Sequence, residues 1–219
     1  MKVGYKKLGW VFGAVVALAL LPVRADAQFI RYSPIFWSFE GSAGVSLPLG
    51  DLGDTAESGT AFTLAASYFL NPRFALRAEG GLDLLGTSGT VDPDLQLWHF
   101  TGGFEYHITD PTTNTMFAFN LGAGGANFDT SIFTADDGSI GAFQNTYFQA
   151  KGGLQLGYNF SRHAATGTPV ATIFIKGDLH LMFADETESA RYASLGGNTS
   201  GFGTVYAVPI TAGVRINIP

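Results

Sequence analysis

Apolar and polar residues alternate over eight segments of the chain, and this alternation most constrains how the chain can fold. A period of two places successive side chains on opposite faces of a β-strand. In every segment one of the two phases is apolar and carries no charge. The pattern therefore predicts an all-β chain of eight strands. The segments are Ser38–Leu49, Thr60–Leu70, Phe74–Leu85, Leu97–Ile108, Met116–Ala126, Thr146–Phe160, Ala171–Phe183 and Val205–Ile218.

The length of these segments indicates which surroundings the apolar phases face. They run 11 to 15 residues, whereas a tilted transmembrane strand needs about 9–11 residues and soluble strands most often have about 5–6. Length therefore favours strands that face lipid and close into a barrel, because only closure satisfies every backbone group in a membrane. Alternation by itself also fits a soluble, lipocalin-like barrel, in which the apolar phase points inward.

The N-terminus has the pattern of a secretory signal peptide. Three lysines within the first seven residues precede the apolar stretch Leu8–Val23, and the small residues Ala25 and Ala27 occupy the −3 and −1 positions of a cleavage site. This pattern predicts a signal peptide over residues 1–27 and a barrel domain over residues 28–219. An uncleaved N-terminal anchor is the alternative.

Composition excludes several classes of function. Without residues 1–27 the chain has 8 basic and 17 acidic residues, a formal net charge of −9, so nucleic acid is not an expected partner. The chain has no cysteine, which excludes disulfides, thiol catalysis and cysteine-ligated metal centres. Only 14% of its residues are charged, against about 25% in soluble domains, while 14% are aromatic.

The connections between the segments alternate in length and charge. Short connections and long ones follow one another, as in outer-membrane barrels with short periplasmic turns and longer extracellular loops. The long connections hold eleven acidic residues and one basic residue, Arg191. The short connections are Asn71–Arg73, Thr109–Thr115 and Ser161–Val170, and the long ones are Gly50–Gly59, Gly86–Gln96, Asn127–Asn145 and Ala184–Thr204.

Large aromatic residues of the apolar phases gather near both ends of the segments. Two such girdles are expected where a barrel crosses the two membrane interfaces. The loop-side group is Phe62, Trp98, Phe148, Phe183 and Tyr206, and the turn-side group is Phe39, Tyr68, Phe74, Tyr106, Phe117 and Phe160.

On this evidence the chain resembles the eight-stranded outer-membrane β-barrel proteins of Gram-negative bacteria, the OmpA-like and OmpX-like group. The resemblance spans Ser38 to Ile218 and includes the first-strand ending Gly44–Asp51, Gly-Val-Ser-Leu-Pro-Leu-Gly-Asp. It implies an antiparallel, up-and-down transmembrane barrel in the outer membrane. The implied partners are outer-membrane lipid, lipopolysaccharide and the barrel-assembly machinery, and the implied state is a monomer.

The polar phases are expected to point into the barrel. An eight-stranded barrel is only wide enough inside to be filled by side chains, and buried charges must be paired. We therefore expect a lumen ion-pair network. A narrow gated pore, or a metal or proton site at His99, Glu105, His107 and His180, is the alternative. The residues of the expected network are Glu40, Arg77, Glu79, Asp83, His99, Glu105, His107, Lys151, Lys176, Asp178, His180 and Arg215.

Acidic clusters in the two longest connections offer hard oxygen ligands. Such carboxylates could bind Ca²⁺ or Mg²⁺ weakly, including ions that bridge lipopolysaccharide phosphates. Solvated loops kept soluble by charge are the alternative interpretation. The residues concerned are Asp136, Asp137, Asp185, Glu186 and Glu188.

The sequence favours a structural or surface-interaction protein that acts through acidic extracellular loops. The patterns Gly-x-Ser-x-Gly and His-Glu-x-x-His and the P-loop are absent from the chain, so no catalytic residue and no cofactor is expected. The alternatives are a small channel for ions or solutes and, less favoured, a lipid-modifying outer-membrane enzyme.

Pro209 is an unusual residue for a closed barrel. Proline has no N–H for the ladder and is normally confined to edge strands or bulges. We expect a bulge, or an unpaired extension of the last strand, near this residue.

Overall fold

The computed structural model describes residues 37–53, 56–87, 95–110, 112–130, 133–134, 140–141, 144–163, 167–183 and 204–218. All of them belong to one compact unit, Ser33–Pro219; the other unit is Met1–Tyr32. The predicted signal peptide and the acidic clusters at Asp136, Asp137, Asp185, Glu186 and Glu188 lie outside the described residues.

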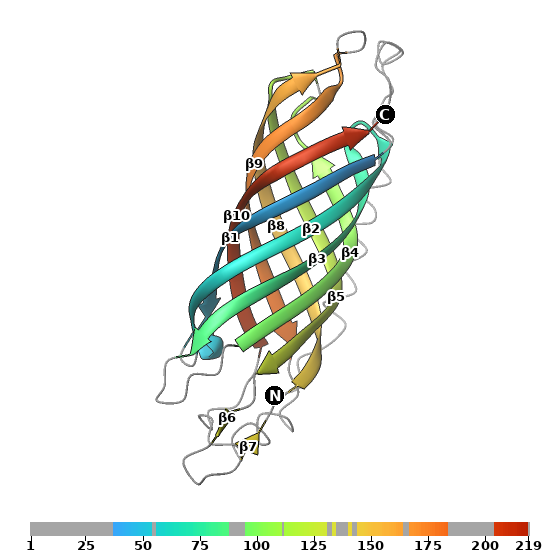
Figure 1. Cartoon of the computed structure of the whole chain (residues 1–219). Coiled ribbons are helices and arrows are strands. Elements are labelled where there is room, and N and C mark those ends of the chain that lie inside the picture. The colour runs from blue at the N-terminus through green and yellow to red at the C-terminus, as the bar shows by residue number, and fades with distance from the viewer. Residues whose placement is uncertain are drawn as a thin grey trace. The chain divides into compact units, whose positions relative to one another are not determined.

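Eight long strands form a closed antiparallel barrel, in which consecutive long strands are neighbours and β1 closes onto β10 (Figure 1). The prediction of an eight-stranded, up-and-down transmembrane barrel is confirmed. The barrel strands are β1 (Trp37–Leu49), β2 (Ala56–Asn71), β3 (Phe74–Thr87), β4 (Leu95–His107), β5 (Thr115–Thr130), β8 (Gln144–Arg162), β9 (Pro169–Phe183) and β10 (Thr204–Ile218). The remaining elements are the 3-10 helix η2 (Gly50–Leu52) and the paired strands β6 (Phe133–Thr134) and β7 (Ile140–Gly141).

Among the described residues, no helix has the length and apolar character needed to span a membrane.

Most strands extend beyond the segments that alternation predicts. The β5–β8 ladder, for example, continues to the pair Asp129↔Gln144, past the predicted ends at Ala126 and Thr146. Backbone hydrogen bonds extend the ladder into residues where the side chains no longer follow the predicted apolar–polar alternation. The sequence pattern therefore marks the part of each strand with a lipid-facing phase, and the barrel itself is taller.

Side-chain polarity is inverted relative to a soluble barrel. The outer face presents large apolar side chains such as Leu64 and Phe100, which are 71% and 67% exposed, while twelve charged or histidine side chains of the strands are buried inside. The lipocalin-like alternative, with its apolar phase inside, is therefore wrong. Such a barrel has backbone groups paired all round and an outer face suited to lipid.

Aromatic side chains pack against one another near both strand ends. The strand ends joined by the short connections are called the turn end here, and those joined by the long connections the loop end. At the turn end, Trp37 lies 5.0 Å from Tyr68 between ring centroids, and Tyr106 lies 5.5 Å from Phe119. At the loop end, the Phe148 and Phe183 rings stack at 5.9 Å. These pairs lie where two interfacial girdles are expected.

Pro209 sits inside β10 without a bulge, so the expectation of a bulge or an unpaired extension is wrong. The β1–β10 register runs without a shift from Trp37↔Ile218 to Leu49↔Tyr206 and includes Ser46↔Pro209. The β10–β9 pairing breaks off after Ala207↔His180 and resumes in the same register at Ile210↔Gly177. The missing N–H therefore interrupts one ladder locally, while the other ladder holds the strand in place.

Candidate functional site

The barrel lumen gathers the ionisable side chains of the strands. All twelve residues expected there are buried, because each occupies an inward position of its strand: Glu40, Arg77, Glu79, Asp83, His99, Glu105, His107, Lys151, Lys176, Asp178, His180 and Arg215. They do not form one uniform group. The guanidinium and ammonium groups bind four of the five carboxylates, and Asp83 stands apart beside the histidine pair His99 and His180.

Arg77 on β3 is the hub of the turn-side part of the lumen. Its guanidinium lies 2.7 Å from a carboxylate oxygen of each of Glu40, Glu79 and Glu105. Glu79 is two residues along the same strand and so points the same way, whereas the other two carboxylates come from β1 and β4. A guanidinium has five N–H donors in a fixed fork, which allows one side chain to serve three carboxylates.

Arg215 on β10 binds two of the same carboxylates, Glu40 on the neighbouring strand β1 and Glu105 on β4. Its Nη2 lies 2.7 Å from Glu105, and its guanidinium also binds Glu40. Its Nη1 lies 3.0 Å from His107 Nε2, and the same His107 nitrogen contacts Glu105. Two arginines and two glutamates thereby cross-link β1, β3, β4 and β10 through the centre of the barrel.

Two lysines complete the network on the β8–β9 side. Lys151 and Lys176 each lie 3.0 Å from Asp178 Oδ2, and both also bind Glu79. Glu79 therefore accepts from Arg77 and from both lysines. A buried charge is tolerated only when it is paired and hydrogen-bonded. Removing any one member of the network therefore takes a counter-charge from its partners, which stay in a low-dielectric interior.

His99 and His180 form a separate layer. Their rings are fully buried and meet edge to face, with centroids 4.6 Å apart. Asp83 lies beside them, with Oδ1 3.8 Å from His99 Nε2, and its Oδ2 accepts a hydrogen bond of 2.7 Å from the Ser46 hydroxyl. Neither ring nitrogen of either histidine has a hydrogen-bond partner within the described part of the chain.

Most inward positions at the loop end are apolar, although the buried Gln149 on β8 is the register partner of Met182 there. There a buried cluster, called the apolar plug below, fills the lumen, and Leu95 and Tyr147 pack against it. Sequence reasoning missed it because the inward phase was taken to be polar along its whole length. The phase assignment itself contains the signal, since Leu97 and Met182 share the phase of His99 and His180. The plug consists of Leu52, Ala56, Leu85, Leu97, Ala126, Phe128, Met182, Val205 and Ala207.

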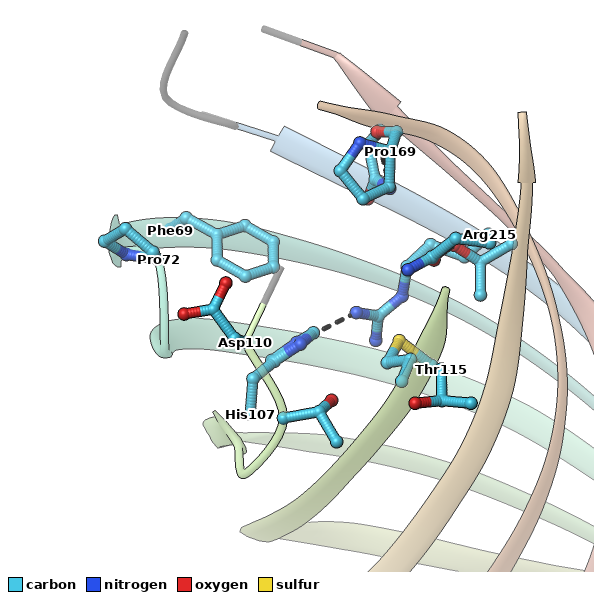
Figure 2. Close-up of a pocket in the computed structure, with 12 residues that line it drawn as sticks. Phe69, Pro72, His107, Asp110, Thr115, Pro169 and Arg215 are labelled. Carbon is cyan, nitrogen blue, oxygen red and sulfur yellow. Dashed lines mark hydrogen bonds between the residues drawn. The ribbon is translucent and has the colours of Figure 1, made fainter. Parts of the chain in front are cut away.

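The turn end of the lumen is hollowed by one small cavity, which reaches His107 and Arg215 between Phe69 and Pro169 (Figure 2). Its volume of about 30 Å³ leaves room for one or two water molecules. At its rim the Thr112 backbone N–H donates to Asp110 Oδ1 at 2.8 Å, which lowers the pKa of that carboxyl from its ordinary value.

The order of layers limits what the lumen can do. Along β9 the inward residues pass from Lys176 and Asp178 through His180 to Met182, and along β4 they pass from Glu105 back through His99 to Leu97. From turn end to loop end the lumen is thus an ionic network, a histidine layer and an apolar plug. A solute would have to break salt bridges and then cross a dry constriction.

Comparisons with known proteins bear on the fold. No protein-family model matches the chain, and no curated protein matches it. Among solved structures it is similar to Neisserial surface protein A, with a TM-score of 0.54 and 14% identity over 84% of this chain and 97% of that one. It is also similar to the outer membrane protein OprG from Pseudomonas aeruginosa, with a TM-score of 0.49 and 11% identity over 86% of this chain and 99% of that one.

A third similar structure is Ail, the attachment invasion locus protein of Yersinia pestis, in complex with the heparin analogue sucrose octasulfate. Its TM-score is 0.47, with 15% identity over 83% of this chain and 99% of that one. At such low identities, the likeness to Neisserial surface protein A concerns the fold alone.

Proposed function

Proceeding from the fold, which is that of the eight-stranded outer-membrane barrels, we propose that this protein is a structural or surface-interaction protein. It resides in the outer membrane of a Gram-negative bacterium and acts through its outer face and its acidic loops. The observation that carries the proposal is the filled lumen, in which the apolar plug lies over the ionic network.

The apolar plug is evidence against the channel alternative. Its central members Leu85, Leu97 and Met182 are at most 1% exposed. A conducting pore needs a continuous polar path, and an apolar constriction without water is a barrier to ions. With the lumen sealed, the surfaces left for function are the lipid-facing wall and the loops.

The loops are the surfaces that would meet external partners. The long connections carry eleven acids and a single basic residue, and carboxylate oxygens suit divalent cations. We assign to them weak cation binding at the clusters Asp136–Asp137 and Asp185–Glu188, bridging to lipopolysaccharide phosphates or to an extracellular ligand. The barrel itself would bind outer-membrane lipid as a monomer after insertion by the assembly machinery.

Three measurements on the wild-type protein test the location and the sealed lumen. The protein is expected in the outer-membrane fraction, with faster gel migration before boiling than after it. Planar-bilayer recordings are expected to show no steady conductance. Recovery from the soluble periplasm without a migration shift would contradict the location, and a steady conductance would contradict the sealed lumen.

Epitope tags test which end of the barrel faces outward. A tag after Gly138 in a long connection should bind antibody on intact cells, whereas a tag after Ala165 in a short connection should require permeabilised cells. The reverse pattern would invert the proposed topology.

Calorimetric titration of the refolded barrel with Ca²⁺ tests the loop acids. Weak binding is expected, and it should fall when Asp136→Asn and Asp137→Asn are combined. Unchanged heat in that double variant would remove this cluster from the proposal.

A further inference from the structure

The histidine layer brings together three metal-binding side chains from three strands. One ligand atom each of His99 on β4, His180 on β9 and Glu79 on β3 lies within 4.8 Å of the others, and all three residues are buried. Donors about 2.1 Å from a tetrahedral ion lie roughly 3.4 Å from one another. Small side-chain rotations would therefore close this cluster around one ion.

The sequence suggested a different combination. Its alternative metal or proton site also included Glu105 and His107, but the structure places these two against Arg215 at the turn side. There the two side chains contact each other and Arg215, so they belong to the ionic network and do not lie with the histidine pair. The histidines that remain together are His99 and His180.

The unpartnered state of the two imidazoles points to a ligand. Neither His99 nor His180 has a hydrogen-bond partner on either ring nitrogen among the described residues, although both rings are fully buried. A buried polar atom without a partner carries a desolvation penalty, which is why such atoms are rare. A metal ion bound to one nitrogen of each ring would remove part of that penalty.

The balance of charge favours a cation at this place. The buried ionisable residues of the described lumen comprise five carboxylates and four arginines or lysines. With neutral histidines one negative charge is left over, and Asp83 is the carboxylate without an arginine or lysine partner among them. Asp83 stands beside the His99 ring, as carboxylates do that orient a metal-bound histidine.

The cations around Glu79 do not prevent this role. Arg77, Lys151 and Lys176 all face Glu79, and a metal ion has to share it with them. Both lysines also lie 3.0 Å from Asp178 Oδ2. Glu79 can therefore turn one oxygen toward the histidines while the lysines keep a carboxylate partner.

Gly81 leaves the space that the His99 ring occupies. A Cβ at this position would lie 2.3 Å from both Nε2 and Cε1 of His99. The ring therefore lies directly over the glycine backbone. A side chain at residue 81 would have to push the ring out of the layer, and its Cβ would also meet the Phe62 carbonyl oxygen at 2.8 Å.

We propose that His99, His180 and Glu79 form an intraluminal binding site for a first-row transition-metal dication such as Zn²⁺. Two imidazoles and one carboxylate, with a water as fourth ligand, are a typical donor set for this class, whereas Mg²⁺ and Ca²⁺ take oxygen ligands. The apolar plug covers the site from the loop end. The proposal requires only the barrel and is independent of the acidic loops.

The test uses the full chain purified from bacterial membranes, unfolded in urea with a chelator and refolded in detergent with Zn²⁺ or Co²⁺. After gel filtration, elemental analysis is expected to find one metal ion per barrel, and Co²⁺ should give the visible absorption bands of a tetrahedral site. Wild-type protein that folds but retains no metal would overturn the proposal.

Matched variants locate the ion. His180→Gln, and separately His99→Gln, should weaken metal binding at least about tenfold, and Gly81→Ala should weaken it too. His163→Gln, at an exposed residue of the β8–β9 connection, is the control and should bind metal as the wild type does. Metal retained equally in His180→Gln and His99→Gln would overturn the assignment.

A second readout uses only the wild-type protein and so does not depend on whether the variants fold. Zn²⁺ added during refolding should raise the temperature at which the wild-type barrel loses its fast gel migration, because a ligand of the folded state stabilises it. The absence of any shift at saturating Zn²⁺ would contradict a site in the lumen.

Discussion

The turn-end and loop-end halves of the lumen are lined by the same strands, yet they bury opposite kinds of side chain. The turn-end half is filled by salt bridges around Arg77 and Arg215, and the loop-end half by the apolar plug around Leu97 and Met182. In the first, stability depends on every charge having its partner. In the second, it depends on filled volume. The two halves should therefore respond differently to substitution.

The largest effect is expected from Arg77→Met, which removes the hub of the ionic half. Three carboxylates would each lose a guanidinium contact of 2.7 Å. Arg215 and the two lysines would remain as their partners, but the buried network would have lost one positive charge, and removing one partner from a buried ion pair costs about 3–5 kcal/mol. Urea unfolding of the barrel in lipid vesicles measures the loss. Combining Arg77→Met with Glu40→Gln should recover part of it, because the excess negative charge is removed.

Arg73→Met in the β2–β3 turn is the matched control for this variant. A surface substitution should change the unfolding free energy by no more than about 0.5 kcal/mol. If both arginine variants lost the same stability, the hub role of Arg77 would be refuted.

In the apolar half, Leu97→Ala should cost about 2–4 kcal/mol, because the fully buried side chain leaves a cavity. Leu97→Met, which conserves volume, should cost less than about 1.5 kcal/mol. The same unfolding assay compares them. Equal losses would show that the plug does not depend on filled volume.

At the border between the halves, Ser46→Ala should cost about 1.5–3 kcal/mol. The Ser46 hydroxyl donates 2.7 Å to Asp83 Oδ2, and hydrogen bonds to charged groups contribute about that much. Adding Asp83→Asn should restore part of the loss, since the unpaired charge is then absent. A double variant less stable than Ser46→Ala would contradict this account of Asp83.

The smallest effect is expected outside both halves, at Asp110 in the β4–β5 turn. The Thr112 N–H bond lowers the pKa of its carboxyl in the folded state below 3.8, its ordinary value. A depressed folded pKa contributes stability above the unfolded pKa, and that contribution is lost as pH falls through the folded pKa. The difference in unfolding free energy between the wild type and Asp110→Asn, measured from pH 6 down to pH 3, should shrink as the Asp110 carboxyl becomes protonated.

The fold could be predicted from the sequence because lipid imposes a simple rule. Every strand needs an uncharged outward phase. Apolar positions such as Leu64 and Phe100 therefore indicate both that a segment is a strand and which of its faces points to lipid. The same alternation places Arg77 and Glu79 on one inner face. What the pattern cannot contain is the set of partners across the lumen. Arg215 on β10 and Glu105 on β4, for example, are 110 residues apart and lie on strands that are not neighbours in the barrel, yet they pair in the lumen.

Three other features were not predicted from the sequence, each for a different reason. The plug was missed because the sequence pattern predicts a polar inward phase from its charged members, whereas Leu97 and Met182 continue that phase as an apolar layer. The pairing of His99 with His180 depends on the tilt and stagger of the strands, which alternation does not specify. Pro209 was misjudged because a second ladder, to β1, keeps the register across it.

The ladder between β1 and β10 also has a consequence for biogenesis. Its thirteen residue pairs join the first long strand to the last, so both strands present open edges until the final segment of the barrel has arrived. Unpaired edges are prone to associate with other chains and cannot rest in lipid. A chain truncated before β10 would lack the strand that closes the barrel, so we expect it not to reach the closed, membrane-inserted form.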